Sequence, residues 1–331
     1  MTESKLYPLR FEPVYQYRLW GGRRLAHWLK APLPIDGPIG EAWLLSDRDD
    51  HPSRVAEGHL KGRTIAQLIE RWPQLMMGKT PGNTRRFPLL LKLLDVQKML
   101  SVQVHPADAN GDLIPEDETG KTEAWVVLEA AAESRIYAGL KTGATVETLR
   151  ALSKPTVDKS LASFHPKPGQ ALLIEAGTVH SLGDGVVVFE IQENSDVTYR
   201  LYDWDHIDPK SGRPRALQVE QALACLDLDQ GPVHPIAPFV EATQPCKRER
   251  LVDDPQFRVW RLQSEVPFNV GAVSEPRVLV CLEGVGSLDH EGIGFAMEKG
   301  AVVLLPAAIG ICRLRPERPV TLLEIAIPVQ P

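Results

Sequence analysis

The segment Leu100-Ser101-Val102-Gln103-Val104-His105-Pro106 alternates polar and apolar side chains. Successive side chains of an extended strand point to opposite faces, so Ser101, Gln103 and His105 share one face and the two valines share the other. This pattern predicts a strand whose valines pack in one layer while three polar groups form a row. An unpaired buried polar group costs about 1–3 kcal/mol, so a buried row would need a metal or a polar ligand. The alternative is a polar row that faces solvent.

Short apolar runs recur along the whole chain, separated by proline and glycine. The 331 residues include 28 prolines and 25 glycines, and such frequent interruption favours many short strands over long helices. The expected strands cover residues 88–96, 100–105, 124–129, 170–175, 186–192, 197–204, 257–262, 277–283, 301–306 and 320–327. This density predicts a mainly β protein with a β-sandwich or jelly-roll fold.

Helical periodicity is confined to three short segments, residues 64–75, 145–152 and 217–226. The first carries one apolar stripe at positions i, i+3, i+4 and i+7, made of Ile65, Leu68, Ile69 and Trp72. We therefore expect a few short helices beside the strands.

Two domains are expected, because a domain usually holds about 150 residues and residues 231–235 have the composition of a linker. The predicted boundary gives an N-terminal domain of residues 1–232 and a C-terminal domain of residues 233–331. Residues 169–177 and 300–308 also resemble each other, each with a turn glycine, an apolar strand and a turn of small residues. In that alignment His180 falls opposite Ile311. If the two halves share one fold, only the first half has polar groups at this site.

The composition excludes several classes of protein. The net charge is −6, whereas a nucleic-acid binder normally shows a basic face. No apolar run approaches the ~20 residues of a membrane-spanning helix, and the first ten residues contain no secretory signal pattern. The four cysteines are widely spaced and form no C-x-x-C pair. We therefore expect a reduced, cytoplasmic protein with no nucleic-acid or membrane partner.

Two further segments carry residue types that bind metals. The segment Gly120-Lys121-Thr122-Glu123 places Lys121 and Glu123 on one face at the start of a strand, and His180 follows a turn at a strand end. With Gln103 and His105 they offer nitrogen and oxygen ligands for Zn²⁺ or another divalent ion. The separations of 2, 18 and 57 residues fit no helical metal motif and suit a barrel that joins distant residues. A lone histidine is nevertheless more often a packed core or surface residue.

A fourth polar segment covers residues 189–204. Glu190 and Gln192 share one strand face, residues 193–196 form a polar turn, and Arg200 returns on the next strand. This spacing predicts a hairpin on which Glu190 and Arg200 are neighbours. Such a pair could be a simple cross-strand salt bridge.

Taken together, these segments resemble the type I phosphomannose isomerases, zinc enzymes of the cupin superfamily, and especially their short bacterial form. The matching motifs, in order along residues 8–204, are Leu19-Trp20-Gly21-Gly22, Gly40-Glu41-Ala42-Trp43, Phe87-Pro88-Leu89-Leu90-Leu91-Lys92, the segments 100–106, 120–123 and 177–180, and the segment 192–203. The resemblance implies two cupin-like jelly-roll barrels, with a metal expected in the first and none in the second. Beyond the domain boundary it is only a general cupin-like pattern.

The resemblance also implies roles for individual residues. The zinc ligands of the family, for one ion per chain, fall on Gln103, His105, Glu123 and His180. Its active-site arginine falls on Arg200, which would also bind substrate. The remaining pocket positions match a serine, a lysine and a glutamate, namely Ser101, Lys121 and Glu190. Of these, Ser101 and Lys121 would bind substrate, and Lys121 and Glu190 would be catalytic together with Arg200. Glu175 departs from the family by standing where a proline is common, but this removes no functional group.

The implied reaction interconverts mannose 6-phosphate and fructose 6-phosphate through an enediol, so the expected partner is a small sugar phosphate. Glu190 or Lys121 could carry the proton, and the sequence does not choose between them. Other possibilities stay open: a cupin that binds sugar without turnover, one that performs other metal chemistry such as dioxygenation or epimerisation, or an isomerase of another phosphorylated aldose. The oligomeric state is not readable from the sequence.

Overall fold

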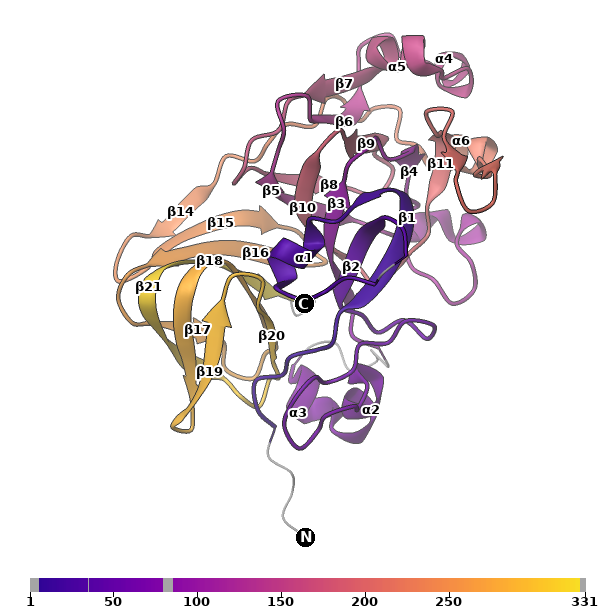
Figure 1. Cartoon of the computed structure of the whole chain (residues 1–331). Coiled ribbons are helices and arrows are strands. Elements are labelled where there is room, and N and C mark those ends of the chain that lie inside the picture. The colour runs from indigo at the N-terminus through magenta and orange to yellow at the C-terminus, as the bar shows by residue number, and fades with distance from the viewer. Residues whose placement is uncertain (1–5, 35, 80–85, 328–331) are drawn as a thin grey trace.

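The computed structural model describes residues 6–34, 36–79 and 86–327, so the expectation drawn from the first ten residues lies partly outside the described part. The protein is built mainly from strands (Figure 1). The short helices are α1 (Leu25–Leu29), α2 (Ile65–Arg71), α3 (Pro73–Met77), the 3₁₀ helix η1 (Asp108–Leu113), α4 (Val146–Arg150), α5 (Lys154–Ser160) and α6 (Val219–Cys225). The prediction of a mainly β fold with a few short helices is confirmed. Among the described residues, none of these helices has the length and apolarity needed to cross a membrane.

Two sheets form the N-terminal β unit. The six-stranded sheet has the order β1 (Val14–Gly22), β2 (Ile39–Leu45), β3 (Leu89–Val96), β10 (Val186–Glu193), β5 (Glu123–Glu129) and β8 (Ala171–Ile174). The five-stranded sheet has the order β11 (Tyr199–Tyr202), β4 (Val102–Val104), β9 (His180–Gly183), β6 (Arg135–Leu140) and β7 (Leu161–Phe164). A small ribbon of β12 (Ile207–Asp208) and β13 (Arg213–Pro214) follows. One apolar cluster takes residues from both large sheets, so the sheets face each other across it.

The six-stranded sheet is buried on both faces. Along β3, Leu91 and Leu93 belong to the cluster outside the unit, whereas Leu94 belongs to the cluster between the two sheets. This follows from the two-residue period of a strand. Lys92 has the same parity as Leu94, so a charged side chain enters the inner face of an otherwise apolar run.

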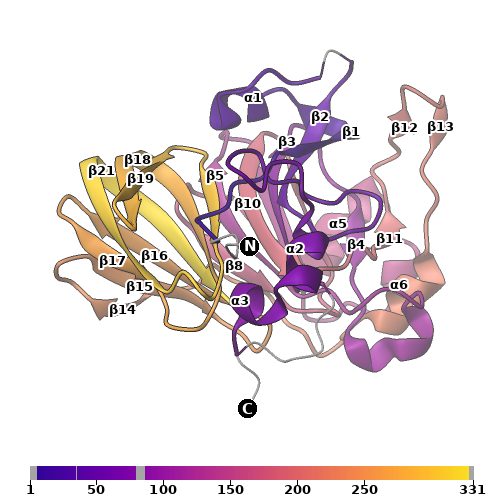
Figure 2. The same cartoon turned by 90° about the horizontal axis from the view of Figure 1, so that it is seen from below.

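The C-terminal β unit covers the outer face of that sheet, as Figures 1 and 2 show in orange and yellow. Its eight-stranded sheet contains β14 (Phe239–Ala242), β15 (Lys247–Asp253), β16 (Arg258–Ser264), β21 (Ile311–Ala326), β18 (Arg277–His290) and β19 (Ile293–Glu298), with β17 (Phe268–Gly271) on β21 and β20 (Val302–Leu305) on β18. Leu91 and Phe189 share one apolar cluster with Val278 and Ile325 of this unit. Residues 226–238 between the units contain no helix or strand. The domain boundary at residue 232 stays a prediction.

Each of the ten predicted strands overlaps an observed strand, although β18 and β21 run far beyond their predicted ends. The predicted helix at 64–75 is wrong in one respect, since it is broken into α2 and α3 at Trp72. Pro73 explains the break, because proline disfavours helical backbone in the residue before it and lacks an N–H to continue the helix. The two other predicted helices match α4 and α6.

Candidate metal centre and adjoining cavity

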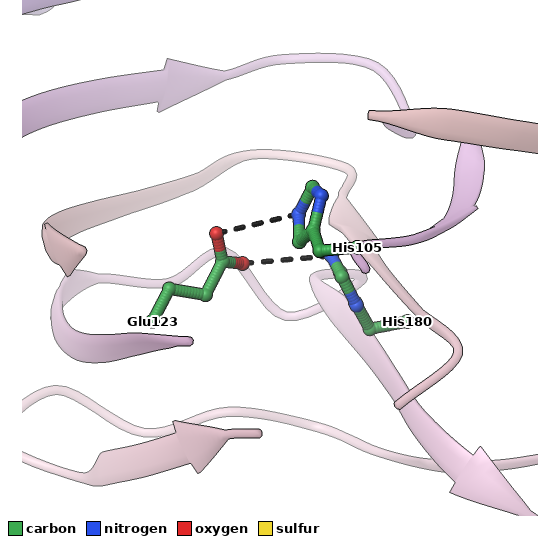
Figure 3. Close-up of side chains that lie close together, drawn as sticks. All are labelled: His105, Glu123 and His180. Carbon is green, nitrogen blue, oxygen red and sulfur yellow. Dashed lines mark ion pairs between the residues drawn. The ribbon is translucent and has the colours of Figure 1, made fainter. Parts of the chain in front are cut away.

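Three side chains that are distant in sequence converge between the two sheets of the N-terminal unit. His105 follows β4, Glu123 begins β5 and His180 begins β9. Their ligand atoms all lie within 4.8 Å of one another, and each residue is at most 1% exposed. Figure 3 shows the Glu123 carboxylate facing both imidazoles, 3.4 Å from His105 Nε2 and 3.5 Å from His180 Nε2. Strand pairing bridges part of the sequence gap, because β4 lies beside β9 with Gln103 opposite His180.

Backbone carbonyl groups fix the orientation of both imidazoles. The Nδ1 atom of His105 lies 2.7 Å from the oxygen of Val197, and that of His180 lies 2.9 Å from the oxygen of Thr178. Since a carbonyl oxygen can only accept, Nδ1 must donate in each ring and Nε2 keeps its lone pair. Burial, with the Lys121 ammonium second, lowers the pKa of His105 to about 3, and burial also lowers the pKa of His180. Two neutral nitrogen donors therefore point at one place, with their other nitrogens held as in metal-binding histidines.

The carboxylate of Glu123 completes this donor set. Burial opposes its ionisation, but the Lys121 ammonium holds the pKa of Glu123 well below its usual value. Lys121 Nζ lies 2.6 Å from Glu123 Oε2 and 3.1 Å from His105 Nε2. The shared face predicted for Lys121 and Glu123 is confirmed. Two imidazole nitrogens and an ionised carboxylate suit a borderline divalent cation.

Gln103 adds a fourth polar group to this cluster. Ser101 Oγ donates to Gln103 Oε1 at 3.0 Å, and Gln103 Nε2 lies 3.2 Å from His180 Nε2 and 3.4 Å from His105 Nε2. The predicted polar row of Ser101, Gln103 and His105 is thus confirmed. Half a turn of the amide would exchange its nitrogen and oxygen, since the two have nearly the same shape. The valines of this strand pack on the opposite face in the cluster that includes α6.

A polar cavity of about 400 Å³ adjoins this cluster. The candidate residues that line it are Ser101, Gln103, Lys121, Glu190 and Arg200. Burial, with the neighbouring Arg215 second, lowers the pKa of the Arg200 guanidinium. Its buried Nε atom has no hydrogen-bond partner among the described residues. Arg200 is therefore a cation that has donor capacity left for a ligand in the cavity.

Glu190 and Arg200 are not neighbours on a hairpin, and that prediction is wrong. β10 pairs with β3 and β5 in the six-stranded sheet, whereas β11 pairs with β4 in the five-stranded sheet. The chain between them crosses from one sheet to the other. The salt-bridge partner of Glu190 is instead Lys92, 3.4 Å away. Glu190 and Arg200 therefore line the cavity from different sheets.

Glu190 differs from Glu123 in its electrostatic surroundings. Burial and the nearby Glu123 charge raise the pKa of Glu190, although Lys92 opposes this effect. Trp125 Nε1 donates to Glu190 Oε2 at 3.0 Å. Two buried carboxyl groups whose pKa values are pushed in opposite directions are typical of sites that separate an anionic role from a proton-transfer role.

Lys92 is a cavity residue that the site motifs do not predict. Its ammonium is buried and lies 3.4 Å from both Glu190 Oε1 and Asp196 Oδ1. Burial opposes the charge, but these carboxylates raise the pKa of Lys92. The signal in the sequence is a single lysine within the apolar run of β3, because a lysine is almost never fully buried unless it is paired.

Comparisons with known proteins agree with this geometry. Residues 9–139 match the family model described as phosphomannose isomerase type I, catalytic domain. Mannose-6-phosphate isomerase ManA of Bacillus subtilis is 31% identical over 310 residues, which cover 93% of this chain and 95% of that protein. Mannose-6-phosphate isomerase of Streptococcus mutans is 31% identical over 304 residues, covering 91% and 93%. The crystal structure of the mannose 6-phosphate isomerase from Bacillus subtilis superposes with a TM-score of 0.87 at 29% identity, over 97% of this chain and 99% of that one.

Proposed function

This chain belongs to the type I phosphomannose isomerase family, and we propose that it interconverts mannose 6-phosphate and fructose 6-phosphate. The observation that carries the proposal is the convergence of His105, Glu123 and His180 beside a charged cavity. A volume of about 400 Å³ lies in the range of small-molecule sites, roughly 300–1,000 Å³, and is adequate for a hexose phosphate.

We propose Gln103, His105, Glu123 and His180 as the ligands of one zinc ion. The fit rests on the donor set: two imidazole lone pairs and an ionised carboxylate face one another, and the Gln103 amide lies against both imidazoles. Four ligands of nitrogen and oxygen type suit Zn²⁺. When bound, a divalent cation supplies Lewis-acid stabilisation of negative charge on the sugar oxygens.

Proton transfer would be carried out by a side chain of the protein. An aldose–ketose isomerisation moves a proton between two adjacent carbon atoms, so it needs a group that can both take and return a proton. Glu190 suits this role, because its raised pKa brings it closer to neutral pH than an ordinary carboxylate. Lys121 is the alternative proton carrier, although its ammonium lies 2.6 Å from Glu123.

Arg200 and Ser101 would bind the substrate. The five N–H donors of an arginine suit either a phosphate or the oxygens that become negative during the reaction. The unpaired Nε of Arg200 is consistent with this role. Ser101 Oγ, which now donates to Gln103, lies in the cavity wall where a sugar hydroxyl could reach it.

A coupled assay of fructose 6-phosphate formation tests the proposal. Purified protein is measured as prepared, after treatment with a chelator, and after zinc is returned, while metal content is determined on the same samples. We expect one zinc ion per chain, loss of turnover with the metal, and recovery on its return. Turnover that survives complete removal of metal would contradict the metal assignment. Sugar phosphate binding without turnover would favour a binding module, and turnover of another phosphorylated aldose would favour a different substrate.

A further inference from the structure

Charged side chains cross the inner face of the six-stranded sheet and lead away from the candidate metal centre. Glu190 on β10 lies beside Lys92 on β3, and the pairing of β2 with β3 places Trp43 directly opposite Lys92. Glu41 precedes Trp43 by two residues on β2, and Arg18 on β1 binds Glu41. These strands are neighbours in the sheet, as Figure 1 shows. The charges of the four ionisable groups alternate in sign from strand to strand.

Glu41 anchors the indole ring of Trp43. Trp43 Nε1 donates to Glu41 Oε2 at 2.7 Å, and Arg18 donates to both carboxylate oxygens, at 2.8 and 3.1 Å. Burial opposes ionisation of Glu41, but Arg18 and Lys92 bring its pKa down to about 2. The indole is therefore hydrogen-bonded to a permanent anion, and Trp43 is only 2% exposed.

The Trp43 ring in turn supports the Lys92 ammonium. Lys92 Nζ lies 5.1 Å from the centroid of this ring, within the range of a cation–π contact. Its two carboxylate contacts, with Glu190 and Asp196, are both long at 3.4 Å. Long contacts fix a flexible four-carbon side chain weakly, so the ring provides a third point of support. Lys92, Glu41 and Arg18 line the cavity, whereas Trp43 is not among its lining residues.

We propose that Trp43, anchored by Glu41, is a positioning residue that holds the Lys92 ammonium at the cavity wall for turnover. The inference rests on the proposed isomerase function. Trp43 would touch neither the substrate nor the metal and would act through Lys92. Loss of its ring should let the ammonium move, and misplacement of a polar group by about 1 Å can cost up to ~100-fold in rate.

Trp43→Leu and Trp43→Phe test this proposal by the separation of kcat from KM. Leucine removes the ring, so kcat should fall at least ~10-fold while KM stays within about twofold and metal content is unchanged. Phenylalanine keeps an aromatic face but loses the N–H donor, so it should restore kcat only in part and leave it about two- to threefold below that of the unsubstituted protein.

Trp28 offers a matched control outside the cavity. It donates from Nε1 to Glu129 at 2.7 Å and carries Lys299 Nζ 3.7 Å from its ring centroid, yet it lies in α1 beside the C-terminal unit. Trp28→Leu should keep kcat. An unchanged kcat in Trp43→Leu would overturn the proposal, and so would a loss of metal from that variant. A fall of kcat in Trp28→Leu as large as that in Trp43→Leu would overturn it too. If Trp43→Leu does not fold, Trp43→Phe decides, because a kcat equal to that of the unsubstituted protein would show that the hydrogen bond from the indole to Glu41 is not needed, which would overturn the proposed anchor. Absence of turnover in the unsubstituted protein would instead remove the proposed function.

Discussion

The two β units of this chain differ most in what fills them. The N-terminal unit brings Lys92, Glu123 and Glu190 onto an inner sheet face beside a cavity of about 400 Å³. In the described part of the C-terminal unit, the buried polar or charged residues are only Glu249 and Glu324. Its two buried carboxylates among the described residues are both paired: Glu249 with Lys247 and Arg261, and Glu324 with Arg248 Nη1 and the backbone N–H of Gly271, each at 2.7 Å. Strands and sheets alone therefore do not make a site, which also needs converging polar groups with capacity left for a ligand.

A pair of similar strands makes this difference specific. β8 and β20 fall in the two segments that resemble each other in sequence, and both are strands. After β8 the chain reaches His180, which is fully buried in the candidate metal-ligand cluster. The aligned residue after β20 is Ile311, which is 55% exposed. The chemistry of the N-terminal unit thus depends on which residue stands at the strand end.

His180→Ala should have the largest effect, because it removes the difference between the two units by placing an apolar residue at this position of the first. We expect loss of the metal and at least a ~10³-fold fall in turnover, since a metal acting as Lewis acid contributes several kcal/mol. Metal content and the coupled assay, measured on one preparation, check this.

Ile311→Ala is the matched control at the aligned position of the C-terminal unit. The side chain is 55% exposed, so its truncation should change neither metal content nor turnover. Full metal content in His180→Ala would contradict the ligand assignment.

Arg200→Ala distinguishes the contribution of the cavity to turnover from that of the metal. We expect the metal to stay, because Arg200 supplies no ligand atom to the cluster, while kcat falls about 10²–10³-fold through loss of a fixed charge. Arg261→Ala, which removes an arginine paired with Glu249 in the C-terminal unit, should keep kcat. Normal turnover in Arg200→Ala would remove Arg200 from the chemistry.

The fold could be predicted from the sequence where apolar runs are strong. Ten of the strands follow from such runs, because a buried strand needs apolar residues whatever its neighbours are. β1 was not predictable in this way, because residues 14–22 mix polar and aromatic side chains and become a strand through pairing with β2 and β3. Pairing partners are set by tertiary structure, and for the same reason the spacing of Glu190 and Arg200 predicts a hairpin that does not exist.

The candidate site was predictable to the extent that its residues stand in compact motifs. Alternation along a strand gives the shared face of Ser101, Gln103 and His105, and the family resemblance adds Glu123 and His180. Lys92 and Trp43 also stand in motifs of the resemblance, residues 87–92 and 40–43, but these motifs assign them no role, because their contact depends on strands β2 and β3 lying side by side. A lateral row across a sheet leaves no fixed spacing in the sequence.

Glu193→Gln tests whether burial of an ionised carboxyl group lowers the stability of the N-terminal unit. Burial raises the pKa of Glu193 from 4.5 to about 7, although it accepts a hydrogen bond from the backbone N–H of Thr122 at 2.8 Å. The folded state then binds more protons than the unfolded state between pH 4.5 and 7, so stability falls as the pH rises through this range.

Glutamine keeps an acceptor for Thr122 and does not titrate, so this fall should disappear. Relative to the variant, the unsubstituted protein should lose about 3 kcal/mol at most between pH 4.5 and 8. Denaturant unfolding of both proteins across this pH range measures the difference. Parallel stability curves would contradict the prediction.

Cys281→Ala should have the smallest effect. It tests whether the C-terminal unit contributes to the candidate metal centre. Cys281 is fully buried in the apolar cluster of the C-terminal unit, together with Cys246 and Cys312. Burial raises the pKa of Cys281 to about 12, so its thiol stays neutral and is a poor metal ligand. A buried thiol of this kind packs like a small apolar group, and its removal should cost about 1 kcal/mol of stability. Metal content and kcat should be unchanged, whereas a loss of metal in Cys281→Ala would show that the C-terminal unit contributes to the metal centre after all.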